Sequence, residues 1–175
     1  MEQEKRKHRV CFTGHRPEKI NCSEKTIKAW LEMEIRKSVS NGQNVFISGM
    51  ARGTDIWAAE VVLKVREEMQ NVKLICASPY PNFESRWSEE WINRYRAIMK
   101  KADYVQFIHK KYCPSCFQDR NEWMVDRSSK VIAVYNGTSG GTRNTLKYAK
   151  KRDVPVTIYS SKEKDILDVL QGREM

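Results

Sequence analysis

The sequence predicts an α/β fold, and two patterns indicate it. Six short runs rich in β-branched or aromatic residues alternate with longer segments whose apolar residues recur at helical spacing. Alternation of this kind is typical of a parallel sheet with right-handed crossovers and helices on both faces. We therefore expect a Rossmann-like three-layer sandwich, in which a mostly parallel sheet of about six strands lies between two layers of helices.

The predicted strands are the short apolar runs, and the first, second, third and fifth are followed within two residues by glycine or serine. They cover residues 9–12, 45–47, 72–76, 104–108, 131–135 and 154–159. The last run contains Pro155, which has no amide hydrogen for the strand ladder. This run is therefore expected at an edge of the sheet.

The predicted helices each carry one apolar stripe. Apolar residues recur every four positions between residues 27 and 39 and again between residues 57 and 65. Ser23 is expected to cap the first of these helices, and the Asn-Gly pair at 41–42 is expected to end it. Each helix can thus cover one face of the sheet.

Length and composition indicate one globular domain. The 175 residues fit a single domain spanning 1–175, in which residues 1–7 are expected to form a flexible basic tail. Hydrophobic residues make up 40% and charged residues 31%, which is typical of a packed core. No apolar run approaches the roughly 18 residues of a membrane span, and no apolar signal core follows the charged start. A cytoplasmic location without membrane association is therefore expected.

The charge of the chain predicts an anionic partner. The formal net charge is +10 and the pI about 9.4, so positive potential concentrates anions near the surface. A polynucleotide and a small phosphate ester both fit this charge. The basic residues are spread along the predicted helices, without the aromatic strand of RNA-binding domains or zinc-finger spacing, which favours an ordinary solvated surface.

The five cysteines indicate reduced thiols. Cys11 and Cys76 lie inside apolar runs, and an odd number cannot all pair within one chain. Cys113 and Cys116 form a CxxC pair, but no second pair supplies the other ligands of a structural zinc site. We therefore predict no metal site and no cofactor. His109 lies close to the CxxC pair in sequence, so a metal site that includes it is kept as an alternative.

Three glycine-rich turns follow the first, second and fifth predicted strands. They cover residues 13–17, 48–55 and 136–142. Because the carboxyl ends of parallel strands share one edge, these turns are expected to meet in a single crevice. Glycine lets a backbone approach a ligand closely, and inward-pointing amides beside a helix N-terminus bind anions. The turns therefore predict a cradle for a phosphate-sized anion.

Individual side chains in these segments have more than one interpretation. Arg16 offers the forked donor geometry that suits phosphate or carboxylate. Asp55 fits either a helix cap or a ligand contact. The segment 48–55 satisfies neither the P-loop nor the GxGxxG pattern. The helix over 117–127 carries amides and arginines that fit either a base-reading, phosphate-clamping face or a surface helix with ion pairs.

Four motifs resemble the YpsA-like branch of the SLOG superfamily. They lie at residues 11–19, 48–60, 120–126 and 140–142, and the resemblance runs in order from about residue 8 to 160. It implies a Rossmann-like fold and a nucleotide or nucleotide-derived ligand held by the glycine motifs. The turns and the resemblance together predict these ligand-binding residues: Thr13, Gly14, His15, Arg16, Ser48, Gly49, Arg52, Gly53, Thr54, Asp55, Arg120, Asn121, Asp126, Gly140, Gly141 and Thr142.

Two related families supply alternative functions. The segment 48–55 is similar to the glycine-arginine-glycine segment of the DNA-processing protein that loads recombinase on single strands. The segment 140–142 is similar to the second motif of the Lonely Guy phosphoribohydrolases, which split a base from a ribose phosphate. That enzyme motif continues with a glutamate where this chain has Thr145. N-glycosidic cleavage requires charge stabilisation and a proton donor, so the missing acid favours binding over hydrolysis.

The first hypothesis is therefore a protein that binds or senses a nucleotide-like molecule. Arg16 and Arg52 are expected to neutralise its phosphate, and Asn121 or Asp126 to read its base or ribose. The alternatives are a nucleotide N-glycosidase, for which no catalytic residue is identified, and a single-stranded DNA-binding protein. The sequence does not decide whether the protein forms a homodimer.

Overall fold

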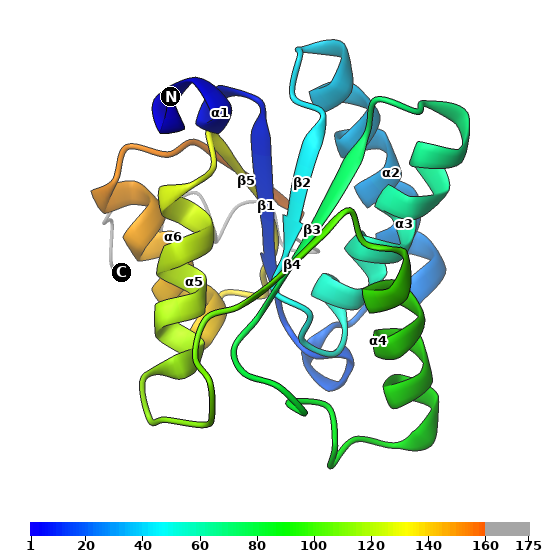
Figure 1. Cartoon of the computed structure of the whole chain (residues 1–175), viewed down its shortest axis with the longest axis vertical. Helices are drawn as coiled ribbons and strands as arrows, with labels where there is room; N and C mark the ends of the chain where they lie inside the picture. The colour runs from blue at the N-terminus through cyan, green and yellow to red at the C-terminus, as the bar shows by residue number, and fades with distance from the viewer. Residues whose placement is uncertain (160–175) are drawn as a thin grey trace.

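A computed structural model describes residues 1–159 of the chain, so residues 160–175 of the predicted domain lie outside the described part. All six strands are parallel, in the order β4-β3-β2-β1-β5-β6 (Figure 1). Their bounds are β1 (Arg9–Gly14), β2 (Val45–Ser48), β3 (Lys73–Ser78), β4 (Tyr104–Phe107), β5 (Lys130–Val134) and β6 (Val156–Tyr159). The predicted parallel sheet is confirmed, with the proline-containing run at its edge.

Helices cover both faces of the sheet. They are α1 (Glu2–Lys7), the short 3-10 helix η1 (Pro17–Lys19), α2 (Glu24–Ser40), α3 (Thr54–Glu68), α4 (Glu89–Lys101), α5 (Cys116–Asp126) and α6 (Gly141–Lys151). Helices α2, α3 and α4 pack on one face, and α5 and α6 on the other (Figure 1). The three-layer sandwich is thus confirmed. Within residues 1–159, no helix combines the length and apolarity needed to cross a bilayer.

Two apolar layers hold the sandwich together. Successive side chains of a strand point to opposite faces, so Phe12 packs in the layer beneath α2–α4 and Cys11 in the layer beneath α5 and α6. Leu31 and Trp57 bring the predicted helix stripes into the larger layer. Met124 anchors α5 in the smaller layer.

Local signals at the ends of α2 act as predicted. The Ser23 hydroxyl accepts a hydrogen bond from the Thr26 amide at 3.1 Å, which satisfies one unpaired donor of the first helical turn. Gly42 follows the helix with φ of 82°, a left-handed conformation that glycine adopts without strain. The first crossover therefore has defined ends.

The amino terminus differs from the expected flexible tail. Glu2–Lys7 form α1, and the Arg6 guanidinium donates to the Ser128 carbonyl at 2.9 Å. Arg9 also pairs with Glu2. Arg6 thus joins the amino-terminal helix to the residues just before β5.

Candidate functional site

The three glycine-rich turns lie at one edge of the sheet, where β1, β2 and β5 end. The strand order reverses between β1 and β5. The chain after β1 leads to α2 on one face, whereas the chain after β5 leads to α6 on the other. Such a reversal opens the crevice in which sheets of this type bind ligands. Thr13 and Ser48 are buried at the ends of β1 and β2, directly behind this edge.

The first two turns pack against each other without a gap. A Cβ added at Gly14 would lie 2.3–2.5 Å from atoms of the Thr54 side chain. Thr54 Oγ1 in turn donates to the His15 carbonyl at 3.2 Å. Gly53 has φ of 89°, and a Cβ there would lie 2.7 Å from the same carbonyl oxygen. These glycines therefore serve the contact between the turns, and Thr54 fills the space beside Gly14 that the sequence analysis assigned to a ligand.

A buried arginine and a buried aspartate lie beneath the second turn. The Arg120 guanidinium donates to the Gly49 carbonyl at 2.7 Å and to Asn121 Oδ1 at 3.2 Å. Asp55 Oδ2 accepts from the Ala51 amide at 3.2 Å. Burial raises the pKa of Asp55 to about 6, against the opposing effects of Arg120 and the Ala51 amide. Burial likewise lowers the pKa of Arg120, with Asp55 opposing it.

This arrangement corrects two interpretations. Gly53 is the N-cap residue of α3, so Asp55 is not the helix cap; it lies in the first turn of the helix. Arg120 belongs neither to a surface ion pair nor to an exposed phosphate clamp, because its side chain points inward to Gly49 and Asp55. The polar face predicted for α5 is therefore partly internal.

The remaining arginines of the first two turns lie at the surface. Arg52 Nη1 pairs with Glu18 Oε1 at 2.8 Å, which links the second turn to η1. Arg16 is exposed. Both guanidinium groups are thus near the edge, and Arg52 already has a carboxylate partner.

Asp126 lies away from the turns. It is the last residue of α5, a helix that returns from the carboxyl edge of the sheet to the start of β5. Its carboxylate accepts from the Tyr148 hydroxyl at 3.0 Å and pairs with Arg152 Nε at 3.0 Å. The structure therefore does not bring Asp126 together with the three turns.

The third turn is the open one. A Cβ at Gly137, Gly140 or Gly141 would meet no atom within 4 Å. Gly140 is the N-cap of α6, and no side chain caps the helix amides there. Thr142 is buried in the first turn of this helix. Unlike the first two turns, this turn leaves its glycines accessible to a ligand.

Three buried polar atoms converge where β1 and β5 end. The rings of His15 and Tyr135 stack with centroids 5.5 Å apart, and their side chains are 6% and 2% exposed. His15 Nε2, Tyr135 Oη and Arg143 Nε are three of the eight buried side-chain atoms within residues 1–159 that have no hydrogen-bond partner. Burial lowers the pKa of His15, helped by Lys19 and opposed by Asn136. The imidazole is therefore neutral near pH 7.

Tyr135 and Arg143 were not among the predicted ligand-binding residues. Tyr135 ends the fifth apolar run and was counted as a strand residue. Arg143 follows Gly141 and Thr142 directly, in the first turn of α6. Its position at the start of a helix that follows a glycine-rich turn could have identified it as a candidate anion-binding residue.

A cavity of about 20 Å³ lies next to the unpartnered atoms of His15 and Tyr135 and is lined by both residues, among others. It is large enough for a water molecule.

A family model matches nearly the whole described chain. This model, YpsA, describes the YspA SLOG family and matches residues 10–163. The chain belongs to this family. It is 33% identical over 118 residues to the SPbeta prophage-derived protein YoqJ of Bacillus subtilis, covering 61% of the chain and 69% of the relative. It is 29% identical over 142 residues to the UPF0398 protein of Bacillus pumilus, covering 76% of each.

Solved structures confirm the fold of this family member. DNA processing protein A of Helicobacter pylori, whose structure concerns its single-stranded DNA binding mode, superposes with a TM-score of 0.69 at 19% identity, covering 99% of the chain and 76% of that protein. The molybdenum cofactor binding protein of Rippkaea orientalis gives a TM-score of 0.60 at 16% identity, covering 97% and 88%. Both share the Rossmann-like arrangement.

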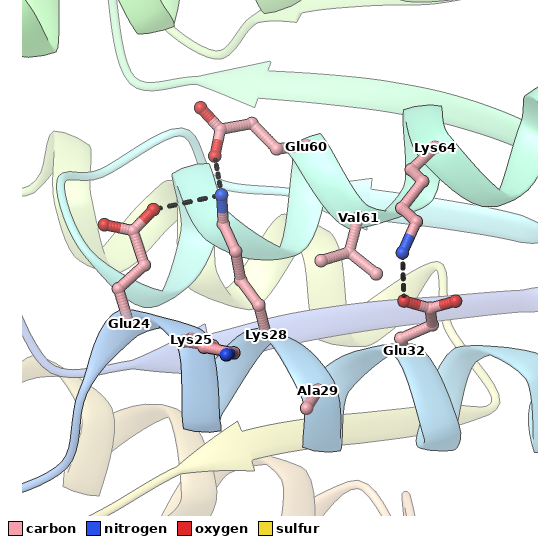
Figure 2. Close-up of a pocket in the computed structure, with 8 residues that line it drawn as sticks. All are labelled: Glu24, Lys25, Lys28, Ala29, Glu32, Glu60, Val61 and Lys64. Atoms are coloured by element: carbon pink, nitrogen blue, oxygen red, sulfur yellow. Dashed lines mark hydrogen bonds and ion pairs between the residues drawn. The ribbon is translucent and has the colours of Figure 1, made fainter.

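Larger hollows lie between helices, away from the glycine turns. One of about 620 Å³ lies between α2 and α3, where Lys28 pairs with Glu24 and Glu60 and Lys64 pairs with Glu32 (Figure 2). Another, of about 430 Å³, lies between α3 and α4. Because these charged groups already satisfy one another, the grooves offer a ligand less than the unpartnered atoms of the crevice do.

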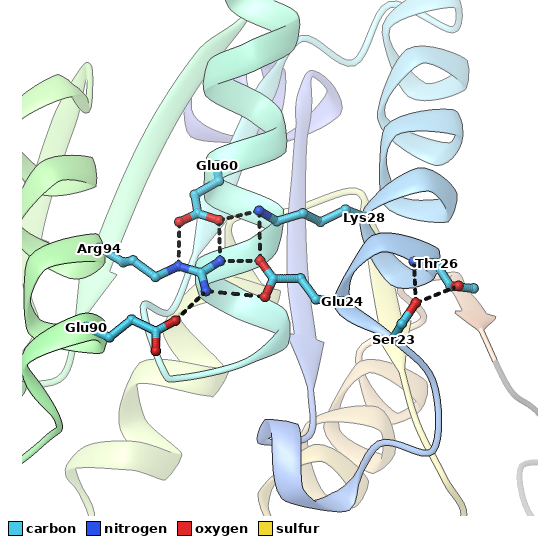
Figure 3. A network of polar contacts seen from close by, with 7 residues as sticks. All are labelled: Ser23, Glu24, Thr26, Lys28, Glu60, Glu90 and Arg94. Atoms are coloured by element: carbon cyan, nitrogen blue, oxygen red, sulfur yellow. Dashed lines mark hydrogen bonds and ion pairs between the residues drawn. The ribbon is translucent and has the colours of Figure 1, made fainter.

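The network around these grooves fastens one helical layer. Arg94 of α4 donates to Glu60 of α3 at 2.7 and 2.8 Å and also contacts Glu24 of α2, while Glu90 lies 3.6 Å away (Figure 3). The pKa of Arg94 is raised, chiefly by its hydrogen bonds to Glu60. This layer is therefore a fixed support for the first two turns.

The raised pKa of Asp55 predicts a pH-dependent stability. Folded Asp55 holds its proton up to about pH 6, whereas in the unfolded chain it ionises near 4. The stability from this proton is complete below about pH 4 and is lost as pH rises through about 6. Relative to Asp55→Asn, the wild type should gain about 2 kcal/mol between pH 7 and pH 4.

Urea unfolding of both proteins at several pH values measures this difference. Asp126→Asn is the matched control, because that carboxylate is half-buried at the opposite edge. A wild-type-minus-variant difference that stays flat from pH 7 to pH 4 would show that folding does not raise the pKa of Asp55.

Proposed function

We propose that this chain binds a nucleotide or nucleotide-derived ligand in the crevice between the ends of β1 and β5. One observation carries the proposal: the buried and unpartnered His15 Nε2 and Tyr135 Oη lie beside the open N-terminus of α6. Buried polar atoms almost always have partners, so their convergence at a ligand-binding edge points to a missing partner.

The chemistry of the crevice suits a phosphate ester. The exposed amides of Gly140 and Gly141 and the positive end of α6 would hold the phosphate, with Arg143 neutralising its charge. Neutral His15 and the Tyr135 hydroxyl would then bond to the ribose or base. The net charge of +10 favours anion capture.

Several contacts support binding or sensing rather than hydrolysis of the ligand. Thr145, at the position of the glutamate in the hydrolase motif, is buried, and its hydroxyl donates to the Gly141 carbonyl at 2.9 Å. Glu122 bonds to Gln118 at 3.1 Å, and Asp126 lies at the opposite edge. Neither Glu122 nor Asp126 therefore presents a free carboxylate to a ligand beside the third turn.

Calorimetric titration with nucleoside phosphates and ADP-ribose derivatives tests the proposal. Tyr135→Phe removes a buried hydroxyl that has no partner, so the unliganded fold should keep its stability while affinity falls about tenfold. Arg143→Met should weaken binding further. Arg152→Met, which removes an arginine at the opposite edge, is the matched control and should bind normally.

Two results would contradict this proposal. One is that no nucleotide-like compound binds or raises the melting temperature. The other is that Tyr135→Phe unfolds more easily than the wild type with unchanged ligand affinity, since the hydroxyl would then have a structural partner.

A second candidate is single-stranded DNA binding, which an exposed aromatic cluster favours. The rings of Tyr80, Tyr112 and Phe117 contact one another with centroids 5.8–6.5 Å apart, where the chain leaves β3 and β4. Tyr112 is 60% exposed and adjoins the exposed Lys110 and Lys111. Aromatic faces beside basic residues are the usual platform for unpaired bases.

Fluorescence anisotropy with an oligothymidylate separates the two candidates. DNA binding through this cluster predicts an affinity that falls steeply with salt, and a loss of about tenfold for Tyr112→Ala. Tyr104→Ala, an exposed tyrosine at the start of β4, is the control. Equal effects of the two substitutions, or binding that ignores salt, would exclude this role for the cluster.

A further inference from the structure

We propose that His109, Cys113 and Asp119 form a binding site for a zinc ion at the start of α5. The proposal is separate from the ligand crevice. One nitrogen, one sulfur and one oxygen from these side chains lie within 4.8 Å of one another. Imidazole, thiolate and carboxylate are the three ligand types of protein zinc sites, and a three-residue set leaves a fourth position for water.

The distances require only small adjustments. Ligand atoms around a tetrahedral zinc ion lie about 3.4–3.8 Å apart, given metal–ligand distances of about 2.0–2.3 Å. His109 Nε2 and Asp119 Oδ2 are hydrogen-bonded at 2.7 Å and would separate slightly around the ion. All three side chains are half-buried, so an ion can reach them from solvent.

The backbone positions of the ligands are already fixed. The His109 amide donates to the Pro79 carbonyl at 3.0 Å, and the Asp119 amide donates to the Ser115 carbonyl at 2.8 Å. The Cys116 amide donates to the Cys113 carbonyl at 3.1 Å, which closes the turn between them. The site is therefore held before any ion binds.

A second layer of contacts orients the ligands. The Ser115 hydroxyl donates at 2.8 Å to Asp119 Oδ2, the oxygen that faces His109 Nε2, and so fixes the orientation of this carboxylate. Outer hydrogen bonds of this kind are characteristic of metal-binding carboxylates. On binding, the Cys113 thiol would release its proton to solvent, and His109 would coordinate through Nε2 as neutral imidazole with its proton on Nδ1.

The structure selects different ligands from those suggested by the CxxC spacing. Cys116 is fully buried in the first turn of α5, whereas Cys113 is half-buried in the loop. The pair therefore does not act together, and Asp119 takes the place of the second thiol. Asp119 precedes Arg120, so an ion here would also stiffen the helical turn that supports Gly49.

Cobalt substitution and zinc competition with a chromophoric chelator, both in a thiol-free reductant, test the site on the full chain. The cobalt complex should show a thiolate charge-transfer band, and Cys113→Ser should remove it and weaken zinc binding by about tenfold or more. Asp119→Asn and His109→Gln should also weaken zinc binding. Cys22→Ser, a half-buried cysteine elsewhere, is the matched control and should bind zinc normally.

Three outcomes would overturn the proposal. These are a cobalt spectrum without a thiolate band, a band that survives Cys113→Ser, and a band lost in Cys116→Ala but not in Cys113→Ser. Circular dichroism of each variant without metal confirms that it is folded, so a loss of binding is not mistaken for unfolding.

Discussion

Replacing Gly14 by alanine should lower the free energy of unfolding by about 3 kcal/mol, because the new methyl group overlaps a buried side chain. Atoms of Thr54 lie 2.3–2.5 Å from the position that the Cβ would occupy. Thr54 is fully buried at the start of α3, and its hydroxyl is bonded to the His15 carbonyl, so it cannot move aside cheaply. Urea or thermal unfolding of the variant measures the effect.

Two further variants make this prediction specific. Gly141→Ala adds the same methyl group at the third turn, where nothing lies within 4 Å, and should change stability by less than about 0.5 kcal/mol. Thr54→Gly in the Gly14→Ala background removes the overlapping atoms and should restore part of the loss. If Gly14→Ala were as stable as Gly141→Ala, the close packing of the first two turns would be refuted.

Arg120→Met should destabilise the protein by about 3 kcal/mol, because a buried carbonyl loses its charged hydrogen-bond donor and a buried carboxyl loses a nearby positive charge. The substitution leaves Asp55 buried without its counter-charge, and the Gly49 carbonyl loses a donor at 2.7 Å. The second turn should loosen as a result. Denaturant unfolding gives the free energy, and hydrogen exchange of the Ala51 amide reports the loosening.

Double substitution separates the lost charge pair from lost packing. Asp55→Asn combined with Arg120→Met removes both charges, so the double variant should be more stable than Arg120→Met alone at pH 7. Arg127→Met is a control near the same helix, where the guanidinium lies 4.2 Å over the Trp123 ring at the surface. A double variant no more stable than Arg120→Met would mean that Asp55 and Arg120 do not interact.

The fold could be predicted from local sequence patterns, because the spacing of apolar residues reflects which side chains are buried. The six apolar runs became the six strands, since each lies between covered faces or at an edge of the sheet. Ser23 and Gly42 marked the ends of α2 correctly because capping and positive φ depend on neighbouring residues alone. Pro155 placed the last strand at the edge for the same local reason.

The site was less predictable because its contacts are not local. Arg120 reaches the Gly49 carbonyl across 71 positions, and no spacing rule connects the two. A glycine after a strand fits both a ligand contact and a close packing contact, and only the position of Thr54 distinguished these at Gly14. Tyr135 looked like an ordinary strand residue, because a buried hydroxyl without a partner is visible only in three dimensions.

The contact between the first two turns has an evolutionary consequence. Gly14 and Gly53 are required by the packing of the turns themselves, so we expect selection for a folded protein to retain them whatever the ligand is. A change at Gly14 is tolerated only together with a smaller residue at position 54, so the two positions should covary among relatives. Residues 136–143 carry no such constraint at their glycines, and ligand preference can diverge there while the familiar glycine signature persists.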